Sequence, residues 1–235
     1  ILPSKFAPPT ELLDLQPLLP SVFGEDSFSK LFSFKEFNLI QTQTFHDLFK
    51  TDKNCLVCSP PGSGKSSCGV FAILRMLSVN PDGKCVYVAP TDYIAGSTFK
   101  EWSKLFGKLL PDGAVVRLAG ETVPDLAKVS SGKIIVTAAS HWDMLSRRWR
   151  QRKPIQQVTL MIFDDLHFLG GEMGPVMEIV ISRTRYMSSE LDNPGIRMIG
   201  LGASIANAKD IGDWIGVAGK SLFNFSPKAR PMPLE

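Results

Sequence analysis

The chain has 235 residues and a mass of 25.8 kDa, with 44% hydrophobic and 21% charged residues. These values are ordinary for one globular domain, or two small ones, that can bury a core, and they exclude a disordered tail, a collagen-like repeat and a coiled coil. The net charge of +3 is too small to indicate nucleic-acid binding by itself. No apolar run approaches the roughly 18 residues that a membrane span needs, so we expect no membrane partner.

Residues 1–33 are rich in proline and only weakly periodic, which predicts an extended lead-in with one short helical piece that stays outside the core. From Phe34 onward, short apolar runs alternate with stretches of helical period. The runs predict strands at 55–58, 85–89, 115–118, 134–137, 160–163 and 198–201. The stretches predict helices at 41–49, 65–77, 94–109, 140–147, 176–187 and 207–215. We therefore expect one α/β domain over 34–225 with a mostly parallel sheet covered on both faces, followed by a linker at 226–235.

Four cysteines occur, and two of them, Cys55 and Cys58, form a CxxC pair. A zinc site normally needs four ligands, and the sequence has neither a second such pair nor a histidine at ligand spacing. We interpret the pair as two thiols in a buried strand, and all four cysteines as free thiols of an intracellular, reducing compartment.

The strongest chemical signal is the string S-P-P-G-S-G-K-S that starts at Ser59 and follows the first predicted strand. Gly62 and Gly64 allow a tight turn whose N–H groups point at phosphate oxygens, and the helix that follows adds its partial positive charge. Lys65 can reach the β and γ phosphates, and the Ser66 hydroxyl can bind Mg²⁺. Ser59 replaces the first glycine of the usual phosphate-loop pattern. The alternative is a glycine-rich turn with a chance Lys-Ser pair.

The second signal is the string L-M-I-F-D-D-L-H at 160–167, in which a buried strand ends on two carboxylates. Ligands bind at this end of the strands in open α/β sheets. Asp164 is therefore placed to hold Mg²⁺ through its water shell, and Asp165 to orient and deprotonate an attacking water. Aspartate is one methylene shorter than the glutamate usual at the second position, so we expect slow hydrolysis. The alternative is a strand that ends in capping acids.

At this point the sequence resembles the Ski-type DExH-box RNA helicases of superfamily 2. Within them it is similar to the Brr family of spliceosomal helicases, and specifically to the first RecA-like domain of the C-terminal cassette. Three strings carry this resemblance: the phosphate loop, the acidic box, and F-N-L-I-Q-T-Q at 37–43, which looks like the family's Q motif. Further matching strings lie at 8–18, 145–149, 170–172, 174–176, 204–210 and 230–235.

The resemblance implies a RecA-like P-loop NTPase fold that binds ATP and Mg²⁺. It implies that Gln41 reads the adenine edge, that Phe37 packs near the base, and that a second RecA-like domain supplies an arginine finger. It further implies RNA and other spliceosomal proteins as partners, and a nuclear location. The expected cofactor-binding residues are Gln41, Pro61, Gly62, Ser63, Gly64, Lys65, Ser66 and Ser67. The expected catalytic residues are Asp165, Asp164 and Lys65, and the expected Mg²⁺ ligands are Ser66 and Asp164.

Three family motifs are altered. The DEVH or DEIH box has aspartate at Asp165, the TPEKWD element reads A-A-S-H-W-D at 138–143, and the SAT box begins with Gly202. The resemblance thus implies a weakly active or inactive cassette of an ATP-dependent RNA helicase in pre-mRNA splicing. The alternative is a nucleotide-regulated module that docks splicing factors without catalysis. A P-loop kinase fits less well, because no lid or acceptor site is recognisable.

Two further clusters have more than one interpretation. The run 147–153 places five positive charges beside Trp149, which could follow RNA phosphates and stack a base, or form a solvated loop that Trp149 anchors. Five phenylalanines between residues 28 and 45 are more typical of a core than of a ligand platform. They are Phe28, Phe32, Phe34, Phe37 and Phe45.

Overall fold

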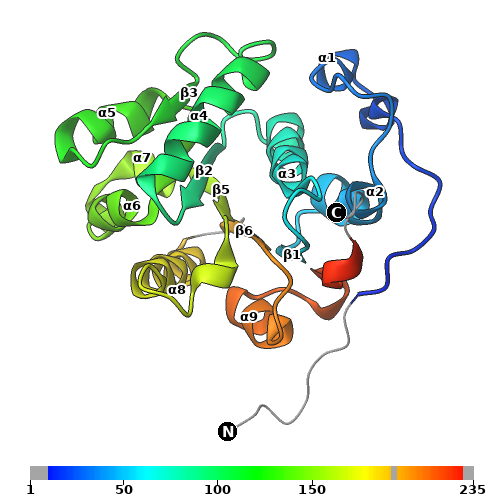
Figure 1. The fold of residues 1–235 in the computed structure, drawn as a ribbon. Helices are drawn as coiled ribbons and strands as arrows, with labels where there is room; N and C mark the ends of the chain where they lie inside the picture. Colours follow the sequence, from blue (N-terminus) through cyan, green and yellow to red (C-terminus); the bar gives the residue numbers. More distant parts are fainter. Residues whose placement is uncertain (1–9, 192–194, 230–235) are drawn as a thin grey trace, which may run out of the picture. The chain divides into compact units, whose positions relative to one another are not determined.

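The computed structural model describes residues 10–191 and 195–229 (Figure 1). The chain divides into two compact units. One unit comprises Ile1–Arg75 and Met198–Glu235, and the other comprises Met76–Arg197. We call them the loop unit and the acidic unit, after the phosphate loop in the first and the two carboxylates in the second. The first two residues of the matching string at 8–18 and the whole string at 230–235 lie outside the described residues.

The loop unit is built on three parallel strands, with β1 (Cys55–Cys58) between β6 (Arg197–Gly202) and β7 (Leu222–Asn224). All four residues of β1 are fully buried, so the strand is covered on both faces. The helices of this unit are α1 (Asp26–Ser29), α2 (Leu39–Phe45), the first part of α3 (Lys65–Val79) and α9 (Ala208–Ile215). The predicted helix at 41–49 is α2 followed by one wider π turn at His46–Lys50.

The lead-in contributes to the core of the loop unit. A short 3-10 turn at Pro20–Phe23 and α1 bury Phe23 and Phe28, which are 5% and 4% exposed. Thr10 extends the edge of β7, because its N–H donates to the Asn224 carbonyl at 2.6 Å and its hydroxyl accepts the Asn224 N–H at 2.7 Å. The expectation that this segment is no core layer is wrong at Phe23 and Phe28, whereas the burial of Phe28 agrees with the expectation that the phenylalanine cluster is core.

The acidic unit has four parallel strands in the order β3 (Val115–Arg117), β4 (Ile134–Ala138), β2 (Lys84–Ala89), β5 (Val158–Phe163). Every residue of β2 and β4 is buried, as the predicted two-sided covering requires. Around these strands the chain forms α4 (Asp92–Phe106), α5 (Thr122–Ser131), α6 (Ala139–Ser146), α7 (Lys153–Gln156) and α8 (Gly174–Glu190), coloured green to yellow in Figure 1.

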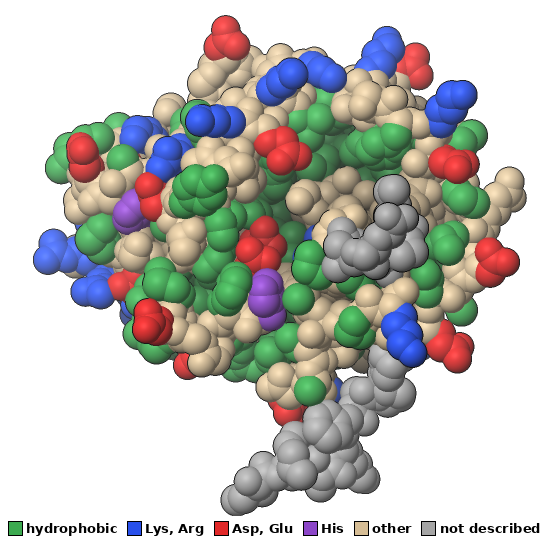
Figure 2. All heavy atoms as spheres, viewed as in Figure 1, with side chains coloured by type: hydrophobic (Ala, Val, Ile, Leu, Met, Phe, Trp, Pro, Cys, Tyr) green, Lys and Arg blue, Asp and Glu red, His purple; other side chains and the backbone are tan. Residues whose placement is uncertain are grey.

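Every strand pairing within either unit is parallel, and helices separate the strands along the chain. The predicted α/β fold is therefore confirmed. Among the described residues, no helix combines the length and apolar composition needed to cross a membrane. On the face drawn in Figure 2, acidic and basic side chains are interspersed, in keeping with the small net charge.

Candidate functional site

The phosphate loop has the strand, turn and helix context that the sequence predicted. It leaves β1 at Cys58 and enters α3 at Lys65. Gly62 and Gly64 have φ values of 75° and 84°, a left-handed conformation that glycine adopts without steric cost. A methyl group on Gly64 would also lie 2.4 Å from the Gln41 side-chain nitrogen, so a side chain here would displace the Gln41 amide. The tight turn predicted at these two glycines is thus present in the backbone.

Ser59, which replaces the first glycine of the pattern, is fully buried. Its hydroxyl lies 2.7 Å from the Ser63 hydroxyl, and its N–H donates to the Gly202 carbonyl at 2.9 Å. The paired hydroxyls satisfy each other across the turn, which explains how the loop accommodates a serine here. Gly202, the residue at the first position of the altered SAT box, is the last residue of β6.

Lys65 bonds to its own loop. Its ammonium group donates to the carbonyls of Ser59 at 2.8 Å and Pro60 at 3.1 Å. The positive charge therefore lies within the turn formed by the loop, close to the backbone that would surround a phosphate. Because these carbonyls are weaker partners for an ammonium than a phosphate anion is, Lys65 can exchange them for a bound phosphate.

Two amide side chains from the start of α2 hold the loop from outside. Asn38 donates to the Ser63 carbonyl at 2.9 Å, and Gln41 donates to the Gly64 carbonyl at 3.3 Å. The same two residues form a capping box at the N-terminus of α2, because each side-chain oxygen accepts the other residue's backbone N–H. The structure thus places Gln41, the predicted adenine reader, directly against the phosphate loop. Asn38 was not predicted, although asparagine three residues before glutamine is a capping signal.

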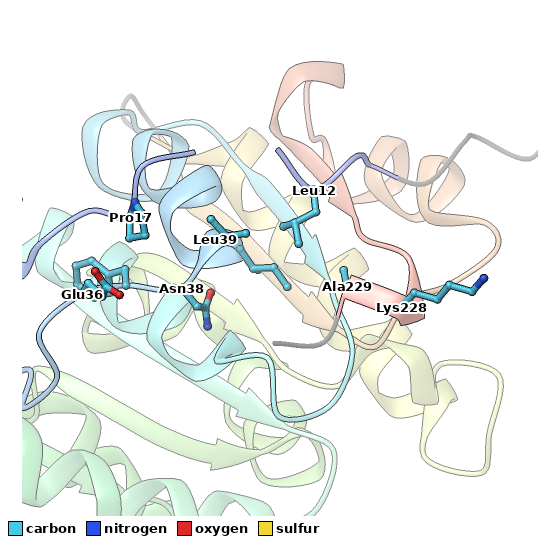
Figure 3. Close-up of a pocket in the computed structure, with 9 residues that line it drawn as sticks. Leu12, Pro17, Glu36, Asn38, Leu39, Lys228 and Ala229 are labelled. Atoms are coloured by element: carbon cyan, nitrogen blue, oxygen red, sulfur yellow. The ribbon is translucent and has the colours of Figure 1, made fainter. Parts of the chain in front are cut away.

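A pocket of about 490 Å³ lies beside Asn38, one of the two residues that hold the loop (Figure 3). Its walls come from Leu12 and Pro17 of the lead-in, residues 36–40 before and within α2, and Lys228 with Ala229. Asn38 lines the pocket and also bonds to the loop, so pocket and loop share a residue. The ring of Phe37 is only 1% exposed and packs edge-on against Phe71 at 5.0 Å between centroids, which leaves it little surface for a base.

The acidic box begins where β5 ends. Asp164 continues the pairing of β5 with β2 by donating its N–H to the Val88 carbonyl at 3.0 Å. One carboxylate oxygen of Asp164 accepts the N–H of Asp165 at 2.8 Å, and the other accepts the Tyr87 hydroxyl. Burial and the Asp164 charge raise the pKa of Tyr87 well above its usual value, so the phenol stays protonated and acts as the donor.

Asp165 follows in a left-handed backbone conformation, with φ 52° and ψ 42°. This conformation directs the chain sharply away from the strand, and an imidazole nitrogen of His167 lies 3.8 Å from the Asp165 carboxylate. No other non-glycine residue that the structure describes has a positive φ. Asp165 is thus the backbone outlier of the described chain, and it occupies the position predicted for the hydrolytic base.

The segment that replaces TPEKWD forms the end of β4 and the start of α6. Ala138 and Ala139 are 2% and 1% exposed, so neither presents a group to a ligand. Asp143 of α6 accepts hydrogen bonds from Arg147, the residue that follows α6, and from Arg183 on α8, the latter at 2.7 Å. The aspartate at the end of this segment therefore ties α6 to α8.

The basic run proves to be an anchored loop. Trp149 is 7% exposed, and the Arg150 guanidinium lies over its ring at 4.8 Å and over the Tyr186 ring at 5.3 Å. Arg150 also bonds to Glu190 at 2.9 Å, and Arg152 bonds to the Leu145 carbonyl at 2.6 Å. The hypothesis that Trp149 stacks on a base is wrong, because the indole is buried.

Comparison with known proteins decides the family. A model described as "DEAD/DEAH box helicase" matches residues 38–211, a span that contains both the phosphate loop and the acidic box. The chain belongs to the DEAD/DEAH box helicase family. The predicted resemblance to DExH-box spliceosomal helicases is confirmed by relatives that match along the whole chain.

Among these relatives of this helicase domain, the mouse U5 small nuclear ribonucleoprotein 200 kDa helicase is 47% identical over 237 residues. The Arabidopsis thaliana DExH-box ATP-dependent RNA helicase DExH13 is 50% identical over 238 residues, and the bovine activating signal cointegrator 1 complex subunit 3 is 41% identical over 235 residues. Each match covers 100% of this chain and 11% of the relative, so the chain spans about a tenth of their length.

A solved structure confirms the helicase fold independently. The DUF1998 helicase MrfA bound to DNA and AMPPNP superposes with a TM-score of 0.70 at 20% identity, covering 90% of this chain and 30% of that one. A further crystal structure of MrfA has a TM-score of 0.68 at 16% identity and covers 86% of this chain. Both superpositions agree with the predicted RecA-like fold.

Proposed function

We propose that this chain is the ATP-binding RecA-like domain of an ATP-dependent RNA helicase in pre-mRNA splicing, the first such domain of a weakly active or inactive C-terminal cassette. One observation carries the proposal: a glycine turn at the start of α3 is clamped by Asn38 and Gln41 beside a pocket wide enough for a base. The U5 and DExH relatives support the RNA substrate, the spliceosomal partners and the nuclear location by their names.

In this proposal the loop amides and Lys65 bind the phosphates, and the neighbouring pocket takes the adenine. Pro61, Ser63 and Ser67 complete the phosphate site, and Gln41 fixes the loop while facing the base. A hydroxyl at Ser66 and a carboxylate at Asp164 are the hard oxygen donors that Mg²⁺ prefers, so the residues present suit this ion. Bound Mg²⁺ would neutralise charge on the phosphates. Asp165 would accept the proton of the attacking water.

A nucleotide titration tests the proposal. Lys65→Ala removes the charge that faces the phosphates, and we expect it to weaken ATP binding by roughly a hundredfold, since charge-assisted contacts of this kind contribute about 1.5 to 3 kcal/mol each. Lys220→Ala, which removes an exposed lysine of the same unit, is the matched control and should leave the affinity unchanged. Equal ATP affinity of the wild-type protein and Lys65→Ala would exclude the proposed site.

A second function has specific support. The family resemblance implies that Asp165 stands at the position of the usual glutamate. It also implies that the first two residues of the TPEKWD element, which touches the RNA backbone in active relatives, are replaced by Ala138 and Ala139, and both alanines are buried. These changes favour a nucleotide-regulated module that docks splicing proteins without turnover. The two functions separate in the full-length protein. RNA-stimulated hydrolysis that is already strong before Asp165→Glu excludes the module, whereas hydrolysis that appears only with Asp165→Glu supports it.

A further inference from the structure

Tyr87 is a buried polar residue in the middle of an otherwise apolar strand. It lies on β2 and is only 3% exposed. In the parallel register of β2 and β5, Tyr87 lies opposite Ile162. Side chains two residues apart on a strand share a face, so Asp164 extends from the same side of the sheet as Ile162. The register therefore brings the phenol of Tyr87 to the Asp164 carboxylate across 77 residues of sequence.

The phenol is held in place by α4. The Trp102 ring packs edge-on against the Tyr87 ring, with 4.8 Å between centroids, and Trp102 is itself 1% exposed. The Thr98 hydroxyl donates to the Tyr87 oxygen at 3.3 Å. The Tyr87 hydroxyl thus accepts one hydrogen bond and has a single proton to give, which it donates to Asp164. Ring packing and hydrogen bonding leave the phenol one orientation.

The Asp164 carboxylate is in turn bound at both oxygens, by the Tyr87 hydroxyl on one and by the Asp165 N–H on the other. A carboxylate bound in this way cannot rotate freely about its terminal torsion. A carboxylate oxygen can accept more than one hydrogen bond, so a carboxylate held in this way can also bind a ligand or a water of a hydrated cation. Such outer contacts orient metal-binding groups, and their loss typically weakens metal affinity about 10-fold to 100-fold.

We propose that Tyr87 is a positioning residue that fixes the Asp164 carboxylate for the hydrated Mg²⁺ of the nucleotide, with Thr98 and Trp102 holding the phenol. The inference rests on the proposed nucleotide site. It assigns to a residue of the second strand, outside the phosphate loop and the acidic box, a part in metal binding. Tyr87 touches neither the phosphates nor the attacking water in this account, so its effect passes through Asp164 alone.

The test measures AMPPNP binding to the full-length protein as a function of Mg²⁺ concentration. The Lys65→Ala protein, measured in parallel, gives the binding at any other nucleotide site, which is subtracted. We expect Tyr87→Phe to raise the Mg²⁺ concentration at half-maximal binding by about tenfold or more. Its AMPPNP affinity in EDTA should stay within about twofold of wild type, since the phosphate loop is untouched. Tyr186→Phe, which removes an exposed phenol hydroxyl on α8, is the matched control and should change neither value.

Asp164→Ala separates this inference from the proposed function. A Mg²⁺ midpoint that moves with Asp164→Ala but not with Tyr87→Phe overturns the role of Tyr87 alone. A midpoint that Asp164→Ala leaves unchanged overturns the proposed metal role of Asp164 and the inference with it. The role of Tyr87 is also overturned if Tyr87→Phe lowers the AMPPNP affinity equally with and without Mg²⁺, because the hydroxyl would then be merely structural. Should Tyr87→Phe not fold, Thr98→Val decides, since an unchanged midpoint in that variant contradicts the inference.

Discussion

Asp165 combines a predicted chemical role with an unusual backbone. Its φ of 52° lies in the left-handed region, which costs most residues about 1 to 2 kcal/mol and which aspartate tolerates better than alanine because of its short polar side chain. We therefore expect Asp165→Gly to be more stable than Asp165→Ala by about 1 kcal/mol in urea unfolding of the chain. Equal unfolding free energies for the two variants would show that the turn relaxes when the carboxylate is removed.

Asp125 is a further residue whose role the sequence did not reveal. Its side chain is 1% exposed and accepts the N–H groups of Ala119, Gly120 and Glu121 at 2.8 to 3.1 Å, together with the Lys128 ammonium. Burial alone would raise the pKa of Asp125, but the hydrogen bonds from Ala119, Lys128 and Gly120 outweigh it and hold the pKa below its usual value. The carboxylate thus fixes the loop between β3 and α5.

This arrangement predicts a pH dependence. Because the pKa of Asp125 is lower in the folded chain, its stabilisation is complete above the unfolded value of about 3.9 and is lost as the pH falls through the folded value. We expect Asp125→Asn to cost about 2 kcal/mol at neutral pH and to reduce the loss of unfolding free energy below about pH 4. Urea unfolding at several pH values measures both. Asp112→Asn, at an exposed position before β3, controls for the removed charge.

At the scale of the elements, the packing of the lead-in depends most on the side chain of Phe23. The Phe23 ring lies within 6.3 Å, between centroids, of six other phenylalanine rings of the loop unit. We expect Phe23→Ala to lower the free energy of unfolding by about 3 to 5 kcal/mol, as for other buried phenylalanines. Phe34→Ala is the matched control, because Phe34 is 39% exposed and should cost much less. Similar losses for both variants would mean that the lead-in packs on the surface only.

The sequence predicted those elements whose signal is local. β1 is a continuous apolar run between polar residues, and it was predicted with its observed bounds of Cys55–Cys58. β7 was missed because Asn224 limits its apolar run to two residues, and α5 was missed because Pro124 and several hydroxyl residues obscure its helical period. Prediction from the sequence therefore succeeded where one stretch of chain carries the complete hydrophobic pattern of a strand or helix. It failed where polar residues or a proline interrupt that pattern.

The same distinction holds for the candidate site. The phosphate loop and the acidic box are contiguous strings, so the sequence indicated them directly. Tyr87 reaches Asp164 only through the register of β2 and β5, and Asn38 reaches Ser63 only through the packing of α2. The sequence allowed Trp149 to be either a base-stacking residue or a loop anchor. Only the burial of the indole in the structure decides for the anchor.

For the molecule as a whole, we expect nucleotide binding without turnover in the isolated chain. The fold corresponds to one RecA-like domain, and the family resemblance implies that a second such domain supplies an arginine finger, which contributes about 10³-fold to 10⁵-fold to hydrolysis rates in related reactions. The 235-residue chain should therefore bind AMPPNP but show no RNA-stimulated release of phosphate. Phosphate release at the rate of the full-length protein, abolished by Lys65→Ala, would contradict this expectation.

The four buried cysteines give each unit an internal chemical label. Cys55, Cys58 and Cys68 belong to the loop unit and Cys85 to the acidic unit, and all four are fully buried free thiols. Burial raises the pKa of Cys58 to about 12 and that of Cys68 to about 11, so almost no thiolate forms at these two residues while the protein is folded. Alkylation by iodoacetamide therefore proceeds only through opened molecules, and mass spectrometry of the modified peptides would report how often each unit opens.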